Sequence, residues 1–180
     1  MRILLMGGGK SGKSTTAQRA ARALAQGGPM YYWATMEPHD DEDLARIRRH
    51  VADREGWGFA TIERARDLTA GLAQVDPAGT VLFDSVTACL AAQMFDEHGQ
   101  MDGGAPERTA AQIAAISRYP AHFVCVCDGI FDGGEDYDPW TAAYVRGLAG
   151  VCRRLAAEFD TVCEMVMGIP HVWKGALPHA

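Results

Sequence analysis

The feature that most constrains the fold of this chain is a glycine-rich segment that directly follows a short apolar run. Residues 1–6 read MRILLM, and the next eight residues read GGGKSGKS, which matches G-x-x-x-x-G-K-[ST] at every fixed position. Glycines let the backbone wrap around a phosphate, and the helix that follows presents its positive N-terminus to the same anion. The segment therefore predicts a strand, a phosphate-binding loop and a helix, with a nucleoside triphosphate as ligand.

Each position of the loop has an expected task. Lys13 can reach the β- and γ-phosphates and is the candidate catalytic cation, and the Ser14 hydroxyl can bind Mg²⁺. The loop alone does not distinguish GTP from ATP. The nucleotide-binding residues predicted from the loop are Gly7, Gly8, Gly9, Lys10, Ser11, Gly12, Lys13 and Ser14.

Apolar runs alternate with helical patterns along the rest of the chain, which predicts an α/β fold. We expect one domain over residues 1–180, with a mostly parallel sheet, helices on both faces and the RecA-like form of the P-loop NTPase fold. The predicted strands are 1–6, 30–34, 59–62, 80–84, 122–127 and 160–167; the predicted helices are 13–26, 40–54, 67–74, 85–95, 107–118 and 140–158. Residues 168–180 are predicted to be irregular.

An aspartate at the end of a buried strand is the second candidate for the metal site. Residues 80–84 read TVLFD, and an apolar run that ends in an acid downstream of a P-loop is typical of a Walker-B strand. Asp84 is therefore predicted to hold Mg²⁺ together with Ser14, through phosphates and water. The alternative is that Asp84 caps the next helix.

Parallel strands place their carboxyl ends at one edge of the sheet, where ligands bind. That edge should gather the loop of residues 7–14, residues 34–36, Glu63, Asp84 and the loop that starts at Asp128. These segments are far apart in sequence, but the architecture predicts that they line one crevice.

Composition limits the partners and the compartment. The net charge is −6, which argues against nucleic acid as a partner. No apolar run is long enough to span a membrane and no signal peptide is recognised, so a cytoplasmic location is expected. The five cysteines are scattered and lie mostly in apolar runs, so we interpret them as buried thiols in a reducing compartment.

His50 is the candidate nucleophile. It lies in the predicted helix 40–54, which begins with acids and carries the arginines 46, 48, 49 and 54 in its later part. Such neighbours can bind phosphates and keep an imidazole neutral, and hence nucleophilic. A lone histidine on a helix is more often a surface residue, and the sequence pattern leaves both interpretations open.

Several motifs resemble those of one enzyme family. Besides the loop, they are YWAT at 32–35, DDE at 40–42, RIxxH at 46–50, WxxxTxE at 57–63 and LFDSVT at 82–87. Together they resemble the bifunctional adenosylcobinamide kinase / adenosylcobinamide-phosphate guanylyltransferase family of cobalamin biosynthesis. The RIxxH element after an Ala-Thr strand end is the most discriminating of them.

The resemblance implies an enzyme with two activities. One transfers a γ-phosphoryl group to the hydroxyl of adenosylcobinamide, a corrinoid, and the other transfers GMP from GTP to adenosylcobinamide phosphate through a guanylylated His50. The implied cofactor is Mg²⁺, GTP or ATP are the implied nucleotides, and a homotrimer is the implied assembly. The further nucleotide-binding residues that the resemblance implies are Ala34, Thr35, Met36, Val51, Ala52, Asp53, Arg54, Glu63 and Asp84.

The resemblance is weaker after residue 90. Lys10 stands where the family usually has arginine, and residues 128–146 depart from the family pattern. This departure leaves open a divergent kinase of another small molecule. The P-loop and the glycine-rich loops at 98–106 and 129–134 leave open a second alternative, a nucleotide-dependent binding or regulatory protein whose loops change order with the nucleotide.

Overall fold

The structure is a computed structural model. It describes residues 1–38, 40–52, 54–96, 98–131 and 137–178, with the exception of the side chains of Arg46 and His50. Within these residues, no helix has both the length and the apolar character that a membrane crossing requires.

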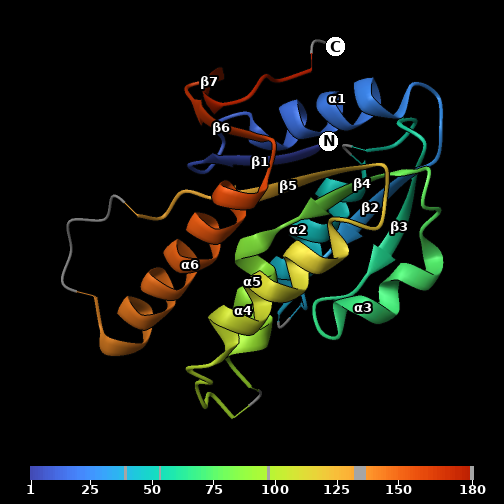
Figure 1. The fold of residues 1–180 in the computed structure, drawn as a ribbon. Coiled ribbons are helices and arrows are strands. Elements are labelled where there is room, and N and C mark those ends of the chain that lie inside the picture. The colour runs from blue at the N-terminus through green and yellow to red at the C-terminus, as the bar shows by residue number, and fades with distance from the viewer. Residues whose placement is uncertain (39, 53, 97, 132–136, 179–180) are drawn as a thin grey trace.

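Up to residue 166 the strands and helices follow one another in the predicted order (Figure 1). The strands are β1 (Arg2–Gly7), β2 (Met30–Ala34), β3 (Phe59–Glu63), β4 (Thr80–Asp84), β5 (His122–Asp128), β6 (Thr161–Val166) and β7 (Ile169–Lys174). The helices are α1 (Lys13–Ala25), α2 (Asp41–Ala52), α3 (Leu68–Gly71) with the 3₁₀ turn η1 (Leu72–Gln74), α4 (Val86–Met94), α5 (Ala105–Ile116) and α6 (Pro139–Glu158).

One sheet of seven strands joins these elements, in the order β3-β2-β4-β5-β1-β6-β7. All neighbouring pairs are parallel except β6 and β7. The strand β1, which leads into the phosphate loop, and the strand β4, which ends at Asp84, are both neighbours of β5. The strand order and the layers confirm the predicted α/β fold.

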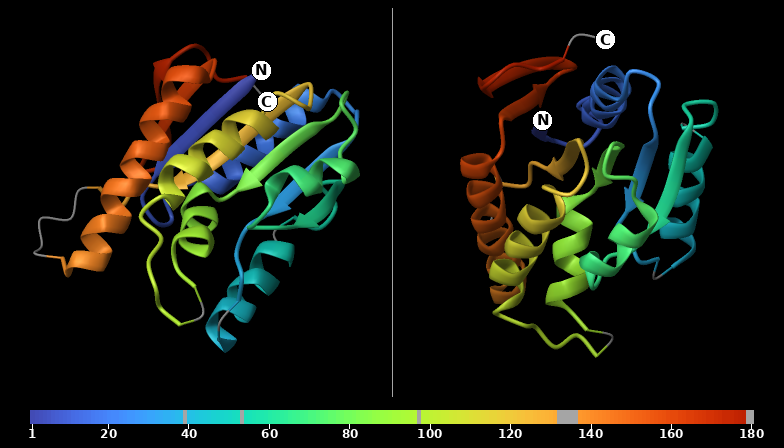
Figure 2. Two further views of the ribbon diagram at one scale, coloured as in Figure 1. Left: turned by 60° about the horizontal axis from the view of Figure 1, so that its bottom comes forward. Right: turned by 45° about the vertical axis from the view of Figure 1, so that its right-hand side comes forward.

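The direction of each crossover decides which face its helix covers. The connections from β1 to β2 and from β2 to β3 run toward one edge of the sheet, and the later ones run toward the other, so right-handed crossovers place α1 and α2 opposite α3 to α6 (Figure 2). Small residues of α1 (Ala17, Ala20 and Ala21) pack against the first face. The larger core cluster lies on the other face, around Trp33, Phe83 and Phe123.

The tail is the part of the fold that the sequence analysis got wrong. Residues 169–174 form β7, which pairs antiparallel with β6 at the edge of the sheet. A two-residue turn joins the strands, and both Met167 (φ 50°) and Gly168 (φ 82°) are left-handed, as a type I′ hairpin requires. Every residue of β7 is exposed, so the strand carries no apolar pattern of the kind that marked the buried strands.

Candidate nucleotide and acceptor site

The carboxyl ends of the strands form a continuous edge, as predicted. Glu63 is paired with Ala34, Ala34 with Asp84, and Asp84 with Val126 on the neighbouring strand. Two residues farther along β5, Asp128 is paired with Gly7, the first residue of the phosphate loop. The register therefore brings together the segments that the sequence analysis assigned to one crevice.

The phosphate loop joins β1 to α1 with two left-handed residues, Lys10 (φ 58°) and Gly12 (φ 91°). A Cβ added at Gly8 or Gly9 would meet no atom within 4 Å, so this backbone borders open space. Gly12 is the N-cap of α1 and provides no side-chain cap, which leaves the first N–H groups of the helix to a ligand. This geometry suits an anion at the start of α1.

Lys13 lies at the centre of the edge and is largely buried. Its Nζ is 2.7 Å from Asp128 Oδ1 and donates a 3.2 Å hydrogen bond to the carbonyl oxygen of Gly8. The backbone N–H of Asp128 in turn donates to the Thr87 hydroxyl over 2.8 Å. The Asp128 carboxylate is thus the counter-ion of the loop lysine in this structure.

Asp128 was placed in the crevice by the sequence analysis but was not included among the site residues. The signal was present, because β5 is an apolar run that ends in an acid, just as β4 is. What the sequence lacked was the order of the strands, which makes β5 the direct neighbour of β1.

Asp84 is held by a tyrosine of the neighbouring strand. The Tyr32 hydroxyl donates a 2.7 Å hydrogen bond to Asp84 Oδ2. Burial, together with the nearby Asp84 carboxylate, raises the pKa of Tyr32 far above its ordinary value, so the phenol stays protonated and remains a donor. Arg54, a residue that is only 8% exposed, covers the Tyr32 ring, with its guanidinium carbon 3.4 Å from the ring centroid. Arg54 thus connects the segment after α2 to Asp84.

Thr35 joins the ends of β2 and β4. Its hydroxyl donates to the carbonyl oxygen of Ser85 over 2.7 Å and accepts from the Ser85 N–H over 2.8 Å. Its own N–H donates to the carbonyl oxygen of Asp84 over 3.1 Å. The side chain is 1% exposed, so its observed role is to position the start of α4.

The other predicted nucleotide contacts lie around this edge. Ala34 and Met36 are half-buried, whereas Glu63, Val51 and Ala52 are exposed. His50 is in the last turn of α2, and its side chain is not among those described; Asp53 also lies outside the described residues. Figure 2 shows that α2 extends beyond the carboxyl edge of the sheet.

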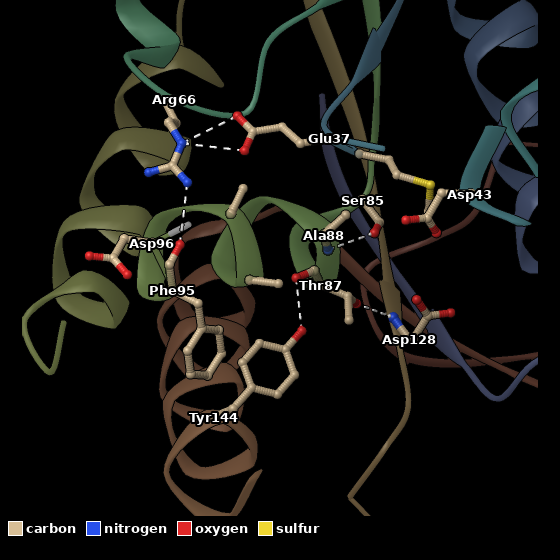
Figure 3. Close-up of a pocket in the computed structure, with 13 residues that line it drawn as sticks. Glu37, Asp43, Arg66, Ser85, Thr87, Ala88, Phe95, Asp96, Asp128 and Tyr144 are labelled. Carbon is tan, nitrogen blue, oxygen red and sulfur yellow. Dashed lines mark hydrogen bonds and ion pairs between the residues drawn. The ribbon is translucent and has the colours of Figure 1, made fainter. Parts of the chain in front are cut away.

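A cleft of about 800 Å³ opens beside Asp128 (Figure 3). Its floor is the face of α4 that carries Ala88, Ala91 and Ala92, and the rings of Phe95 and Tyr144 form one side, with centroids 6.0 Å apart. On the opposite side, Arg66 Nε is 3.2 Å from Glu37 Oε1, and Arg66 Nη2 donates to the carbonyl oxygen of Phe95. Met36 and Asp128 belong to the predicted crevice, whereas the walls from α4, α6 and the loop after β3 were not predicted, because only the packing of these segments brings them together.

Comparison with known proteins identifies the family. A family model described as "Cobinamide kinase / cobinamide phosphate guanyltransferase" matches residues 3–172. The chain belongs to this family. The match covers nearly the whole chain, including the part after residue 90 in which the motifs are weak. It confirms the predicted family and the predicted pair of activities, phosphorylation of adenosylcobinamide and guanylyl transfer to its phosphate.

Two curated members of the cobinamide kinase family are similar over almost their full length. The bifunctional adenosylcobalamin biosynthesis protein CobU of Escherichia coli is 32% identical over 94% of this chain and 97% of its own length. The bifunctional adenosylcobalamin biosynthesis protein CobP of Pseudomonas aeruginosa is 29% identical over 97% of this chain and 98% of its own length.

A solved structure of a protein from Pyrococcus horikoshii OT3 shares the fold of this family member. The superposition covers 97% of this chain and 86% of the Pyrococcus chain, with a TM-score of 0.55 and 8% sequence identity.

Proposed function

We propose that the two activities of the family use one nucleotide edge, with Lys13, Ser14 and Asp84 serving the kinase step and His50 serving guanylyl transfer. The observation that carries this proposal is the position of Lys13. Its ammonium group lies in the phosphate loop and contacts Asp128, so the charge that would bind the γ-phosphate lies beside a carboxylate that lines the cleft. A phosphoryl group bound there is open to an acceptor.

In the kinase step, an oxygen of the acceptor hydroxyl forms a bond to the γ-phosphorus. The bond from the γ-phosphorus to its bridging oxygen breaks, the nucleoside diphosphate leaves, and the hydroxyl proton is released to water. Lys13 exchanges Asp128 for phosphate oxygens and stabilises the charge that develops on them. The uncapped start of α1 contributes backbone N–H donors to the same phosphates.

The donor set at this edge fits Mg²⁺. Ser14 and Asp84 are both half-buried, and each offers the oxygen ligands that this ion prefers. The described residues hold no group of three or more His, Cys, Asp or Glu side chains that could bind a metal without help. This agrees with an ion that completes its shell with phosphates and water. When bound, Mg²⁺ neutralises charge on the transferred phosphoryl group.

In guanylyl transfer, an imidazole nitrogen of His50 forms a bond to the α-phosphorus of GTP, and pyrophosphate leaves. An oxygen of adenosylcobinamide phosphate then forms a bond to the same phosphorus and restores the histidine. The packing of Arg54 on Tyr32 supports this role, because it holds the segment that follows α2 near Asp84. Ala34, Thr35 and Met36, residues 51–54 and Glu63 surround the nucleotide in this proposal.

Intact mass spectrometry after incubation with GTP tests the transfer step. Purified protein should gain the mass of GMP, and the adduct should be labile in acid and stable in base. The adduct should disappear in His50→Ala and persist in His171→Ala, a matched change on the exposed strand β7. An active protein that forms no adduct would exclude His50 as the nucleophile.

A cobinamide phosphorylation assay tests the kinase step separately. Lys13→Ala should reduce turnover by a factor of about 10² to 10³, the range for loss of one charge-stabilising group in a transition state. Unchanged turnover in Lys13→Ala would contradict the proposed role of the loop lysine.

The assembly that we propose is a homotrimer in the cytoplasm. The β6–β7 hairpin supports a contact between subunits, because Met167, Ile169 and Trp173 are 93%, 69% and 64% exposed. Apolar side chains gathered on one surface often mark an interface. Light scattering should give the molar mass of three chains. Replacing these three side chains by serine should lower the measured mass toward that of one chain.

A further inference from the structure

The cleft over α4 begins where the phosphoryl group would be transferred. Asp128, the partner of Lys13, lines one end of it, next to Ser85 and Thr87 at the start of α4. Figure 3 shows Thr87 and Asp128 side by side, joined by the hydrogen bond from the Asp128 N–H. An acceptor in the cleft would therefore have one end at the γ-phosphate.

The floor of the cleft is shaped by small side chains. Ala88 and Ala91 are three positions apart on α4 and half-buried, and they lie in the cleft with Ala92. Phe95 and Tyr144 present ring surfaces beside them, because the Tyr144 hydroxyl is turned inward to the carbonyl oxygen of Thr87 at 2.8 Å. Such a floor offers a broad apolar surface to a large ring system, and its volume of about 800 Å³ is in the upper part of the range for small-molecule sites.

Charge around the cleft distinguishes between substrates. Among the described residues that line it, Glu37, Asp43, Asp96 and Asp128 are carboxylates and Arg66 is a cation. Arg66 is itself paired with Glu37. Even with Lys13 counted beside Asp128, the described charged side chains at the cleft carry a formal net negative charge, which favours a cation over an anion along the α4 face. Adenosylcobinamide is a cation, because trivalent cobalt outweighs the anionic macrocycle and the carbon-bound adenosyl group, and its amide side chains can donate to carboxylates.

We infer that this cleft is the acceptor subsite, in which a cationic corrinoid lies over the α4 face with its reacting hydroxyl at Asp128. The inference rests on the proposed function and deepens it. When Lys13 turns to the phosphates, Asp128 is left to accept a hydrogen bond from the hydroxyl and to orient it. The open side of the cleft leaves the rest of the macrocycle in solvent.

Filling the floor of the cleft tests the inference. In Ala91→Leu and, separately, Ala88→Leu, the added side chain should weaken cobinamide binding about tenfold or more and raise its KM in the kinase reaction. The affinity for GTP should stay within about twofold. Ala115→Leu makes the same change on an exposed face of α5 and should alter neither the affinity for cobinamide nor the affinity for GTP. Equilibrium dialysis, read through the visible absorbance of cobinamide, gives the first affinity, and titration calorimetry with GTP gives the second.

The results separate the two proposals. If both variants bind cobinamide as tightly as the wild-type chain, the acceptor lies elsewhere and only the present inference fails. If they lose GTP affinity instead, the cleft is a nucleotide subsite and the inference is likewise overturned. If the wild-type chain binds no cobinamide and phosphorylates none, the proposed function fails first. Retained GTP binding demonstrates that each variant is folded, and weaker cobinamide binding at higher salt would add support for the carboxylates.

Discussion

The hydroxyl of Tyr32 donates a 2.7 Å hydrogen bond to Asp84 Oδ2, and the guanidinium of Arg54 covers the ring of the same tyrosine. One side chain thus orients the candidate metal ligand and also anchors the segment that follows α2. Because α2 carries His50, the two proposed activities share a physical connection through Tyr32.

Replacing Tyr32 by phenylalanine tests this connection. Tyr32→Phe leaves the ring under Arg54 but removes the donor to Asp84, so the carboxylate is no longer held for its ion. The Mg²⁺ concentration for half-maximal kinase activity should rise about tenfold, as is usual when a partner of a metal ligand is lost. A titration of kinase activity with Mg²⁺ measures the change.

Tyr31→Phe is the matched control. The Tyr31 hydroxyl accepts a hydrogen bond from the Asp76 N–H at the other end of β2, away from the nucleotide edge. The dependence of kinase activity on Mg²⁺ in Tyr31→Phe should therefore equal that of the wild type. If Tyr32→Phe and Tyr31→Phe have the same Mg²⁺ dependence, Tyr32 does not position the ligand.

A second prediction concerns the pair of Lys13 and Asp128. Their side chains are 11% and 24% exposed, so Asp128→Asn leaves a largely buried ammonium without its counter-ion. The free energy of unfolding should fall by about 2 kcal/mol in the nucleotide-free protein. Saturating Mg-GTP should reduce this deficit, because phosphates then take the place of the carboxylate.

Urea denaturation with and without Mg-GTP measures both effects. Asp102→Asn serves as the control, since it breaks an exposed pair with Arg108 far from the loop and should cost much less in either condition. A deficit in Asp128→Asn that is equally large with and without nucleotide would argue against exchange of Asp128 for phosphates.

The cysteines give a third prediction. All five are buried, and burial raises the pKa of Cys89 to about 12. A thiol with such a pKa is protonated at pH 8 and a poor nucleophile. At pH 8 the native protein should therefore release almost no chromophore from a chromogenic disulfide reagent. The urea-unfolded chain should release five equivalents of chromophore, one for each cysteine. Rapid reaction of native Cys89 would contradict the packing around α4.

The N-cap of α6 gives a prediction of pH dependence. Asp138 accepts hydrogen bonds from the N–H groups of Trp140 and Thr141. The hydrogen bond from the Thr141 hydroxyl, followed by these backbone donors, lowers the pKa of Asp138 below its ordinary value of 3.8. Since the folded state favours the carboxylate, the cap is fully stabilising above pH 3.8 and weakens as the pH falls below it.

Asp138→Ala should therefore lower the urea midpoint at pH 7, and the gap to the wild type should narrow at pH 3.5. Asp138→Asn keeps a capping oxygen and should remain close to the wild type at pH 7. A gap in Asp138→Ala that does not change between the two pH values would mean that the charge of Asp138 plays no part in the cap.

The sequence contained the parts of this fold that burial dictates. Apolar runs at β2, β4 and β5 predicted buried strands, and the rule for parallel sheets placed their ends at one edge. β7 was missed because an exposed strand is stabilised by its ladder to β6 and leaves no apolar pattern, although Gly168 in a two-residue turn was a signal of a hairpin.

The site was predictable to the extent that motifs define it. The loop and Asp84 follow from residue types at fixed spacing, whereas the partners of these residues depend on strand order. Asp128 meets Lys13 because β5 is the neighbour of β1, and Arg54 meets Tyr32 because the connection from β2 to β3 passes over the face of the sheet that α1 covers. Neither relationship can be read from spacing along the chain.

The place of β5 between β1 and β4 has a consequence for the choice of nucleotide. Two strand spacings, about 9.5 Å, separate the row of the phosphate loop from the row of Asp84. The hydrogen-bonded ladders on both sides of β5 fix this span, so it sets the minimum length of a ligand that contacts both rows. A triphosphate with its metal ion is long enough to contact both rows in the proposed kinase step.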